Sequence, residues 1–419
     1  MIAPLPIGIS DFKLLIEGGY AYVDKTLFIQ ELIEIGAQVT LIPRLRRFGK
    51  TLNLSMLRYF FEKSPNATSH LFSSLNIWKE PKYRQLQGKY PVIFLSLKDV
   101  KCLSWEETFE KFRQIIASEF ERHRYLLEGD FLSPTEKKSF QLILEVNGNK
   151  ALYECSLNLL TKWLHRYYNK RAILLIDEYD TPAHSAYLGG FYDTLISFLR
   201  NWLSAGLKDN SCLERGVLTG ILRIAKESVF SGLNNLKSVT ILNESFQDKF
   251  GFLESEVKIL LEKYQLANKL PEIREWYNGY RIGSCGGIYN PWSVLTCISE
   301  GGRLYPYWVN TSDNGLMKQL ITKGGEDLKS EIEVLLRDGI VEKTIEDGII
   351  FTSLDNSPAA VWSLLLFSGY VTLASTPVYG KPCQLRIPNV EVGELYKSMV
   401  LECLKKVFIF PNIVCYWTV

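Results

Sequence analysis

The stretch 41–55 constrains the fold more than any other part of the chain, because it contains the triplet Gly49-Lys50-Thr51. Such a triplet is the second half of a phosphate-binding loop. In that loop backbone N–H groups and a helix N-terminus point at a phosphate, the Lys reaches the β- and γ-phosphates, and the Thr hydroxyl binds Mg²⁺. The generic pattern requires a Gly where this chain has Arg44. A basic turn between a strand and a helix therefore stays open as the alternative.

The residues around the triplet favour the phosphate-binding interpretation. Residues 38–42 read as a short strand that ends at Pro43, and residues 51–61 read as a helix with an apolar face. Strand, loop, Gly-Lys-Thr and helix is the order that a phosphate-binding loop requires.

A second pattern lies well downstream, where residues 171–178 form an apolar run that ends in Asp177 and Glu178. A parallel strand that is covered by helices on both faces has this composition. At its carboxyl end, Asp177 would hold Mg²⁺ through water and Glu178 would polarise the attacking water. Together the two patterns predict a P-loop NTPase.

Several longer stretches give the chain a family resemblance, which runs from about Pro6 to about Lys405. The matching stretches are Tyr22–Thr26, Arg44–Thr51, Leu175–Asp180, Thr219–Ser228, Phe230–Asn235, Trp276–Tyr280, Tyr289–Ser293 and Tyr307–Ser312. The chain resembles the bacterial AAA-ATPase-like family, whose members often carry a C-terminal PD-(D/E)xK nuclease-like domain. That family replaces the usual phosphate loop by Arg-Pro-Arg-Arg-Phe-Gly-Lys-Ser/Thr, and here Leu45 stands where Pro is usual.

The resemblance and the loop pattern together give a set of expected ligand contacts for ATP and Mg²⁺. The expected nucleotide-binding residues are Arg44, Arg46, Arg47, Phe48, Gly49, Lys50, Thr51 and Leu52, and the expected metal-binding residues are Thr51 and Asp177. Guanidinium groups suit bidentate contact with phosphate, so the three arginines could replace contacts of the missing glycine. Packing and ion pairs with nearby acids are the alternative for each arginine.

The expected catalytic residues are Glu178, Thr219 and Arg223. Thr219 ends the strand after Glu178, where a polar residue would position the attacking water, or would be only a buried threonine. Arg223 could reach the γ-phosphate or a neighbouring subunit's nucleotide, as an arginine finger does, and Lys226 could do so less readily. Solvated charges are the alternative for both. For Asp180 we favour a cap on the turn before Pro182.

The remaining core pattern alternates strands and helices, which predicts a RecA/AAA-like parallel sheet covered by helices. Further strands are expected at 90–97, 216–220 and 239–242, the last being the final core strand. Helices are expected at 105–127, 151–168 and 191–207, where apolar residues recur at helical spacing.

We predict four parts along the chain. Residues 1–250 form the P-loop ATPase core, 251–328 a helical lid, and 329–407 a winged-helix-like domain, while 408–419 stay unassigned. The winged-helix prediction rests on the apolar run 361–373 followed by residues 383–388, which would be a helix that leads into a two-stranded wing. The aromatic residues 276–280 and Trp292 are interpreted as core, because aromatic clusters stack on bases less often.

Composition excludes several other classes. The net charge is only +2, so binding of nucleic acid would need a local basic patch. The eight cysteines contain no C-x-x-C pair and the four histidines complete no zinc pattern, which favours a reducing cytoplasmic location. The N-terminus lacks a signal-peptide pattern, and no apolar run is long enough to span a bilayer.

The main functional hypothesis is Mg²⁺-dependent ATP hydrolysis that controls the lid and the winged-helix-like part. The alternatives are a nucleotide-gated switch with little turnover and a DNA-associated binding module. A protein partner or weak DNA contact would use the winged-helix-like part, through Lys381, Arg386, Lys397, Lys405 and Lys406. No strand-borne Glu-x-Lys nuclease pattern follows that part, so we expect no nuclease activity. The oligomeric state stays open.

Overall fold

The computed structural model describes residues 2–224, 229–230, 233–308, 325–348, 354 and 357–409, with side chains as far as residue 400. At its centre lies a five-stranded sheet in which every neighbouring pair is parallel. The strands are β1 (Val39–Pro43), β2 (Val92–Ser96), β3 (Ala172–Asp177), β4 (Leu213–Gly220) and β5 (Leu236–Ser238). Strands β1 and β3 are buried along their whole length, as expected for a sheet with helices on both faces.

The strand order is β2-β3-β4-β1-β5, so β4 lies between β1 and β3. All five strands point the same way, and the residues that follow β1, β3 and β4 therefore meet at one edge of the sheet. In open α/β sheets this carboxyl edge is where ligands bind. The α/β P-loop fold that the sequence predicts is confirmed by this parallel, helix-covered sheet.

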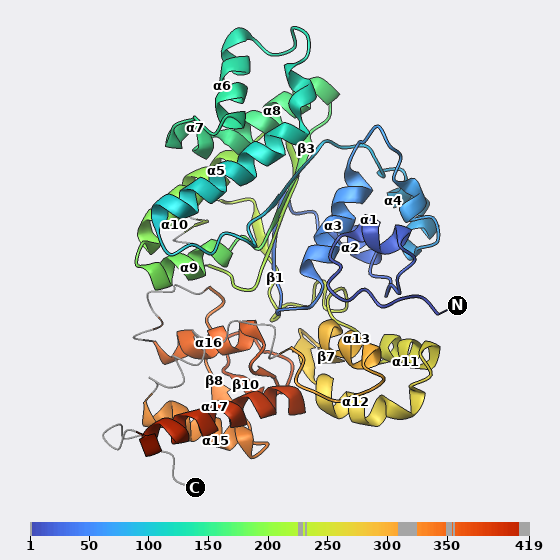
Figure 1. The fold of residues 1–419 in the computed structure, drawn as a ribbon, viewed down its shortest axis with the longest axis vertical. Coiled ribbons are helices and arrows are strands. Elements are labelled where there is room, and N and C mark those ends of the chain that lie inside the picture. The colour runs from blue at the N-terminus through green and yellow to red at the C-terminus, as the bar shows by residue number, and fades with distance from the viewer. Residues whose placement is uncertain are drawn as a thin grey trace.

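Helices cover both faces of the sheet, with α5, α8 and α10 on one side and α1 to α4 on the other (Figure 1). The covering helices are α1 (Phe12–Glu17), α2 (Leu27–Glu34), α3 (Lys50–Phe61), α4 (Pro81–Arg84), α5 (Trp105–Arg122), α6 (Pro134–Leu144), α7 (Lys150–Glu154), α8 (Ser156–Tyr168), α9 (Thr181–Gly189) and α10 (Tyr192–Leu207). Short 3₁₀ turns are η1 (Ser69–Leu71), η2 (Asn76–Lys79) and η3 (Arg124–Leu127). The helix predicted over 151–168 is two helices, which meet at Cys155.

The final core strand lies upstream of where the sequence pattern put it. Strand β5 covers only Leu236–Ser238, whereas residues 239–242 form no strand. Val239 and Ile241 are buried all the same. The backbone turns at Thr240, whose N–H donates to the Asn243 side chain. The prediction of a strand at 239–242 was therefore wrong, because an apolar run signals burial and not extended backbone.

We call residues 252–299 the lid segment. It contains α11 (Glu254–Lys263), η4 (Ala267–Lys269), α12 (Leu270–Tyr277), the antiparallel hairpin of β6 (Tyr280–Ile282) and β7 (Cys285–Ile288), and α13 (Pro291–Ser299). The buried apolar side chains of its three α-helices belong to a cluster separate from the main core, whereas Tyr280, Ile282 and Ile288 of the hairpin belong to the main core. The purely helical lid that the sequence predicts is corrected by this hairpin, which has positive φ at Gly283 in its turn and at Gly287 within β7.

We call the described residues from 325 onward the C-terminal segment. It contains α15 (Glu326–Leu336), β8 (Val341–Lys343), α16 (Pro358–Ser368), β9 (Thr372–Leu373), β10 (Cys383–Arg386) and α17 (Val390–Ile409). The three strands form an antiparallel sheet in the order β8-β10-β9. Its buried residues join the main core cluster. The predicted tail 408–419 lies mostly outside the described residues.

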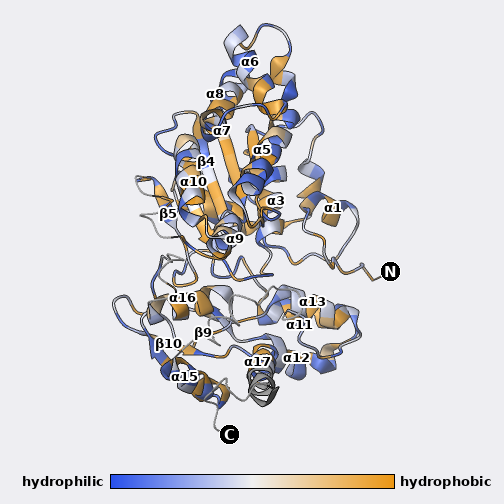
Figure 2. Ribbon diagram, turned by 60° about the vertical axis from the view of Figure 1, so that its left-hand side comes forward, coloured by the Kyte–Doolittle hydropathy of each residue, from blue (hydrophilic) through white to orange (hydrophobic). Residues whose placement is uncertain are grey.

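The lid and C-terminal segments lie side by side below the carboxyl edge of the sheet (Figure 1). Colouring by hydropathy shows the apolar strands enclosed between helices whose outer faces are polar (Figure 2). Helix α16 is apolar on every side, and nearly all of it is buried between its neighbours. Among the described residues, none of the helices combines the length and the apolar character needed to cross a membrane.

Candidate functional site

A cavity of about 790 Å³ lies at the carboxyl edge of the central sheet. It is lined by N-terminal residues on both sides of α1, by the loop 46–53, by the segments that follow β2, β3 and β4, by the lid segment and by the C-terminal segment. Its volume falls within the range of small-molecule sites.

The loop between β1 and α3 has the conformation of a helix N-terminus that is open to a ligand. Gly49 precedes α3 with φ +81°, a left-handed conformation that favours glycine. Arg47 also has a positive φ of +66°, which is uncommon outside glycine and marks a constrained turn. The loop therefore directs its backbone toward the cavity at the start of an α-helix of twelve residues.

Lys50 lies inside this loop and not on its surface. Its Nζ donates to the carbonyl oxygens of Arg44 at 3.0 Å and Leu45 at 2.9 Å. Burial lowers the pKa of Lys50, while the nearby carboxylates of Glu178, Asp180 and Asp177 oppose that shift. A buried ammonium that faces carboxylates and lines a cavity is ready to bind an anion.

Thr51, Asp177 and Thr219 form a continuous chain of hydrogen bonds from the first turn of α3 to the ends of β3 and β4. The Thr51 hydroxyl donates to Asp177 Oδ2 at 2.8 Å, and the Thr219 hydroxyl donates to Asp177 Oδ1 at 2.7 Å. Burial raises the pKa of Asp177, and the two threonine hydroxyls act against this rise. Because Thr219 contacts Asp177, its position supports a role in orienting that carboxylate.

Glu178 follows Asp177 with φ +50°, so the backbone turns sharply at the end of β3. A non-glycine residue in this region is strained, and such strain is found at functional sites. The Glu178 side chain lines the cavity, where Oε2 accepts a hydrogen bond from the Thr181 hydroxyl at 3.1 Å.

Asp180 does not cap the turn before Pro182, and that interpretation was wrong. Its Oδ2 accepts hydrogen bonds from the backbone N–H groups of Ile221 at 3.0 Å and Leu222 at 2.7 Å, beyond the end of β4. The Asp180 side chain forms no capping bond with α9. Burial raises the pKa of Asp180 to about 6. The carboxylate therefore joins β3 to the segment after β4, at the wall of the cavity.

Arg44 has a structural role in place of the predicted phosphate contact. Its side chain is fully buried, and its guanidinium donates to the carbonyl oxygens of Pro43 at 2.9 Å, Val239 at 2.7 Å and Ser245 at 3.0 Å. Burial lowers its pKa to about 9. Arg44 therefore packs inside the protein and does not line the cavity. Its hydrogen bonds connect the end of β1 to the residues after β5.

The other predicted loop residues do lie at the cavity. Arg46, Arg47, Phe48 and Leu52 line it together with Gly49, Lys50 and Thr51. The Arg47 guanidinium lies 4.5 Å from the ring centroid of Trp292 in α13, an arrangement that allows a cation–π interaction. Partial burial lowers the pKa of Arg47. Trp292, which the sequence pattern assigned to the core, is a cavity residue.

Arg223 is not among the residues that line the cavity, although Ile221 and Leu222 just before it are. Its guanidinium forms an ion pair with Asp347 of the C-terminal segment. Lys226 lies outside the described residues. The structure therefore brings together the predicted site residues of the loop and of β3 and β4, and holds Arg223 just beyond them.

The cavity lining also contains apolar residues that the sequence analysis missed. They come from the N-terminal residues and the lid, and they include Pro6, Ile9, Val23, Phe252, Leu260 and Leu295. Lys25 Nζ contacts both carboxylate oxygens of Glu256 in α11, at 2.7 and 2.8 Å. In the sequence, the one signal for this part of the cavity was the stretch 22–26, because it is among the stretches that resemble the family.

Comparison with known proteins agrees with this geometry. The family model described as "AAA-ATPase_like: Predicted AAA-ATPase" matches residues 6–230, which include the loop, β3 and β4. A protein of Azotobacter chroococcum mcd 1, described as "Uncharacterized protein in vnfD 5'region", is 28% identical over 408 residues. The aligned part is 96% of this chain and 70% of that protein.

Proposed function

The chain belongs to the AAA-ATPase-like family, and from this premise we propose that it binds ATP in the cavity at the sheet edge and hydrolyses it with Mg²⁺. The observation that carries the proposal is the arrangement of Lys50, Thr51 and Asp177. A buried ammonium, a hydroxyl and a carboxylate meet there at the N-terminus of α3. This is the set of groups that a nucleoside triphosphate and its metal require.

The triphosphate would lie over the 46–52 loop. The backbone N–H groups at the start of α3 would bind phosphate oxygens, and the Lys50 ammonium would exchange its two carbonyl partners for the β- and γ-phosphates. Arg46 and Arg47 line the same end of the cavity and would add guanidinium contacts. The apolar residues of the lining, which include Val23 and Leu295, would take the adenine.

The residues present suit a magnesium ion. Thr51 and Asp177 offer a hydroxyl and a carboxylate 2.8 Å apart, and oxygen ligands of this kind are the ones Mg²⁺ prefers. When bound, the ion would neutralise charge on the phosphates. Thr219 would keep the Asp177 carboxylate oriented, and Glu178 would accept a proton from the attacking water.

We also propose that the lid segment moves with the nucleotide, relative to the ATPase core of residues 1–250. Helices α11, α12 and α13 of the lid have their own apolar cluster, whereas the buried residues of the lid hairpin and of the C-terminal segment join the main core. Contacts of Arg47 with Trp292 and of Lys25 with Glu256 connect these lid helices to the cavity rim. The proposed movement therefore concerns the helices of the lid, while the hairpin stays packed in the main core.

The first test is Lys50→Ala, with Lys138→Ala as a matched control because Lys138 is exposed on α6. Removal of the Lys50 ammonium should weaken ATP binding at least about 100-fold, since hydrogen bonds to charged groups contribute roughly 1.5–3 kcal/mol each. Isothermal titration calorimetry with ATP and Mg²⁺ measures the affinity. Equal affinity in Lys50→Ala and wild type would refute the proposed site.

The second test is Glu178→Gln, with Glu275→Gln on α12 as the control. The amide keeps the size of the side chain but cannot accept the proton, so ATP should still bind while turnover falls by about 10²–10⁴. Phosphate release measures turnover. Should the variant hydrolyse ATP as fast as wild type, Glu178 has no part in the reaction.

A further inference from the structure

Arg223 is held by an acid from a distant part of the chain. Its guanidinium pairs with the carboxylate of Asp347, which lies 124 residues further along in the C-terminal segment. The side chain of Arg223 is 21% exposed and that of Asp347 is 49% exposed. Ion pairs of this exposure are weak and can be exchanged for a better partner.

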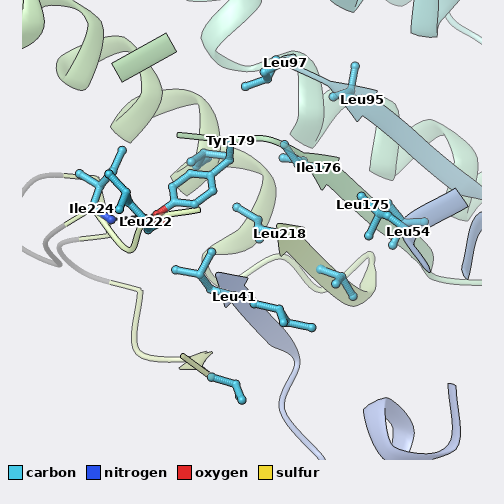
Figure 3. Packing of buried hydrophobic residues seen from close by; sticks show 14 of the residues in the cluster. Leu41, Leu54, Leu95, Leu97, Leu175, Ile176, Tyr179, Leu218, Leu222 and Ile224 are labelled. Atoms are coloured by element: carbon cyan, nitrogen blue, oxygen red, sulfur yellow. Dashed lines mark hydrogen bonds between the residues drawn. The ribbon is translucent and has the colours of Figure 1, made fainter. Parts of the chain in front are cut away.

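The backbone on both sides of Arg223 is fixed by the two residues that follow Glu178. The Asp180 carboxylate accepts from the N–H groups of Ile221 and Leu222. The Tyr179 hydroxyl donates to the Leu222 carbonyl at 2.9 Å and accepts from the Ile224 N–H at 2.9 Å, as Figure 3 shows. Segment 221–224 is therefore anchored to the end of β3 while the Arg223 side chain extends away from it.

This anchoring places Arg223 next to the reaction site. Ile221, Leu222 and Asp180 all line the cavity, so the Arg223 backbone lies one residue beyond the cavity wall. A long side chain at such a position can change direction while its backbone stays fixed. The γ-phosphate, which carries more charge than a carboxylate, would be the stronger partner for a guanidinium.

We propose that Asp347 withholds Arg223 from the γ-phosphate, and that Tyr179 and Asp180 are positioning residues that keep Arg223 within reach of it. This inference rests on the proposed ATPase function. Release of Asp347, through a shift of the C-terminal segment, lets the guanidinium turn to the phosphate and raises the rate of hydrolysis. The C-terminal segment thereby controls turnover through one ion pair.

The test is Asp347→Asn, measured as steady-state hydrolysis of ATP by the full chain. The variant should raise kcat by up to about fivefold, the size expected for loss of a partly exposed ion pair, while KM for ATP stays as in wild type. Asp347→Lys should raise kcat at least as much. Asp327→Asn, which removes an exposed acid of α15, is the control and should leave kcat unchanged.

Arg223→Ala separates this mechanism from a general loosening of the structure. It should lower kcat, and the double variant Arg223→Ala with Asp347→Asn should have the kcat of Arg223→Ala alone, because Asp347 acts only through Arg223. An unchanged or lower kcat in both Asp347 variants, or a double variant as active as Asp347→Asn, would overturn the inference. If hydrolysis depends on Lys50 in the same assays, the proposed function stands even when this inference fails.

Discussion

At the scale of single residues, Gly220 shows how closely the site is packed. A Cβ at this position would lie 2.3 Å from Asp180 Oδ1 and 2.8 Å from its Cγ. Asp180 cannot retreat without giving up its hydrogen bonds to Ile221 and Leu222. Asp180 can therefore connect β3 to the segment after β4 only because Gly220 has no side chain.

Gly220→Ala should therefore disturb both stability and turnover. The added methyl group forces the Asp180 carboxylate out of place, and overpacking of this kind costs about 1–3 kcal/mol. Urea unfolding followed by circular dichroism measures the free energy of unfolding, and phosphate release measures turnover.

The control is Gly393→Ala, since Gly393 lies in α17 with open space around its Cα. That variant should be neutral or more stable, because alanine favours a helix over glycine by about 1 kcal/mol. Equal effects of the two substitutions would show that the Asp180 contact has no energetic weight.

Sequence patterns locate residues whose surroundings are local. Lys50 and Thr51 follow the loop in sequence and Asp177 ends an apolar strand, and the structure brings Thr51 and Asp177 into contact, while their roles in binding stay a prediction. Asp180 and Trp292 were assigned otherwise, because their partners lie far along the chain. Nothing in a one-dimensional pattern shows which distant backbone group a carboxylate will meet.

At the scale of helices and strands, the absence of a local sequence signal explains why the position of β5 was predicted wrongly. The strand itself is short, partly exposed and polar, with Lys237 at its centre. Among the residues that follow, Val239 and Ile241 are apolar and buried, but the backbone turns at Thr240 and forms no strand. Edge strands are short and polar because exposed apolar edges aggregate, so this strand lacks the signal that identified β1 and β3.

The junction of α13 and α17 buries an acid. Glu391, in the first turn of α17, is fully inaccessible and accepts hydrogen bonds from the Ser293 hydroxyl and the Trp308 N–H. Burial raises its pKa to about 7, and these hydrogen bonds oppose the rise only in part. The lid and the C-terminal segment therefore meet at a group that titrates near neutral pH.

Glu391 should make stability depend on pH at this junction. Its pKa is higher in the folded chain than the usual 4.5, so between about pH 4.5 and pH 7 the folded state binds the extra proton. The free energy of unfolding therefore falls as the pH rises through this window, by up to about 3 kcal/mol. Glu391→Gln removes the titration, and its thermal midpoint should exceed that of wild type more at pH 8 than at pH 5.

Thermal unfolding of both proteins at the two pH values measures this effect. Glu394→Gln, an exposed acid one turn further along α17, is the control and should follow the wild-type pH dependence. A difference between Glu391→Gln and wild type that stays constant with pH would contradict the assignment.

At the scale of the whole molecule, the C-terminal segment is poorly suited to nucleic acid. Residues 325–348 contain eight acidic and three basic residues. Of the basic residues proposed for DNA contact, Lys397 pairs with Glu394 and Arg386 donates to the Gly279 carbonyl. Helix α16, which would be the reading helix of a winged-helix domain, is buried.

We therefore expect DNA binding to be weak and dependent on salt. Because two of the proposed cations contact other groups of the chain, the Kd for a labelled duplex at physiological salt should be about 10⁻⁴ M or weaker. Fluorescence anisotropy over a salt series measures it, and incubation with Mg²⁺ or Mn²⁺ should produce no cleavage. A Kd below about 10⁻⁶ M would contradict this expectation, because it would require a basic surface on the protein.

The lining of the cavity combines residues from the beginning of the chain with residues that are synthesised much later. Pro6 and Ile9 contribute one wall, while Leu364, Ser368 and Tyr370 contribute another, more than 350 residues later. A ribosome that adds roughly 5–20 residues per second leaves this gap open for tens of seconds. The loop, β3 and β4 are thus synthesised well before the last wall of the cavity. The cavity is complete only after residues up to Tyr370 have left the ribosome.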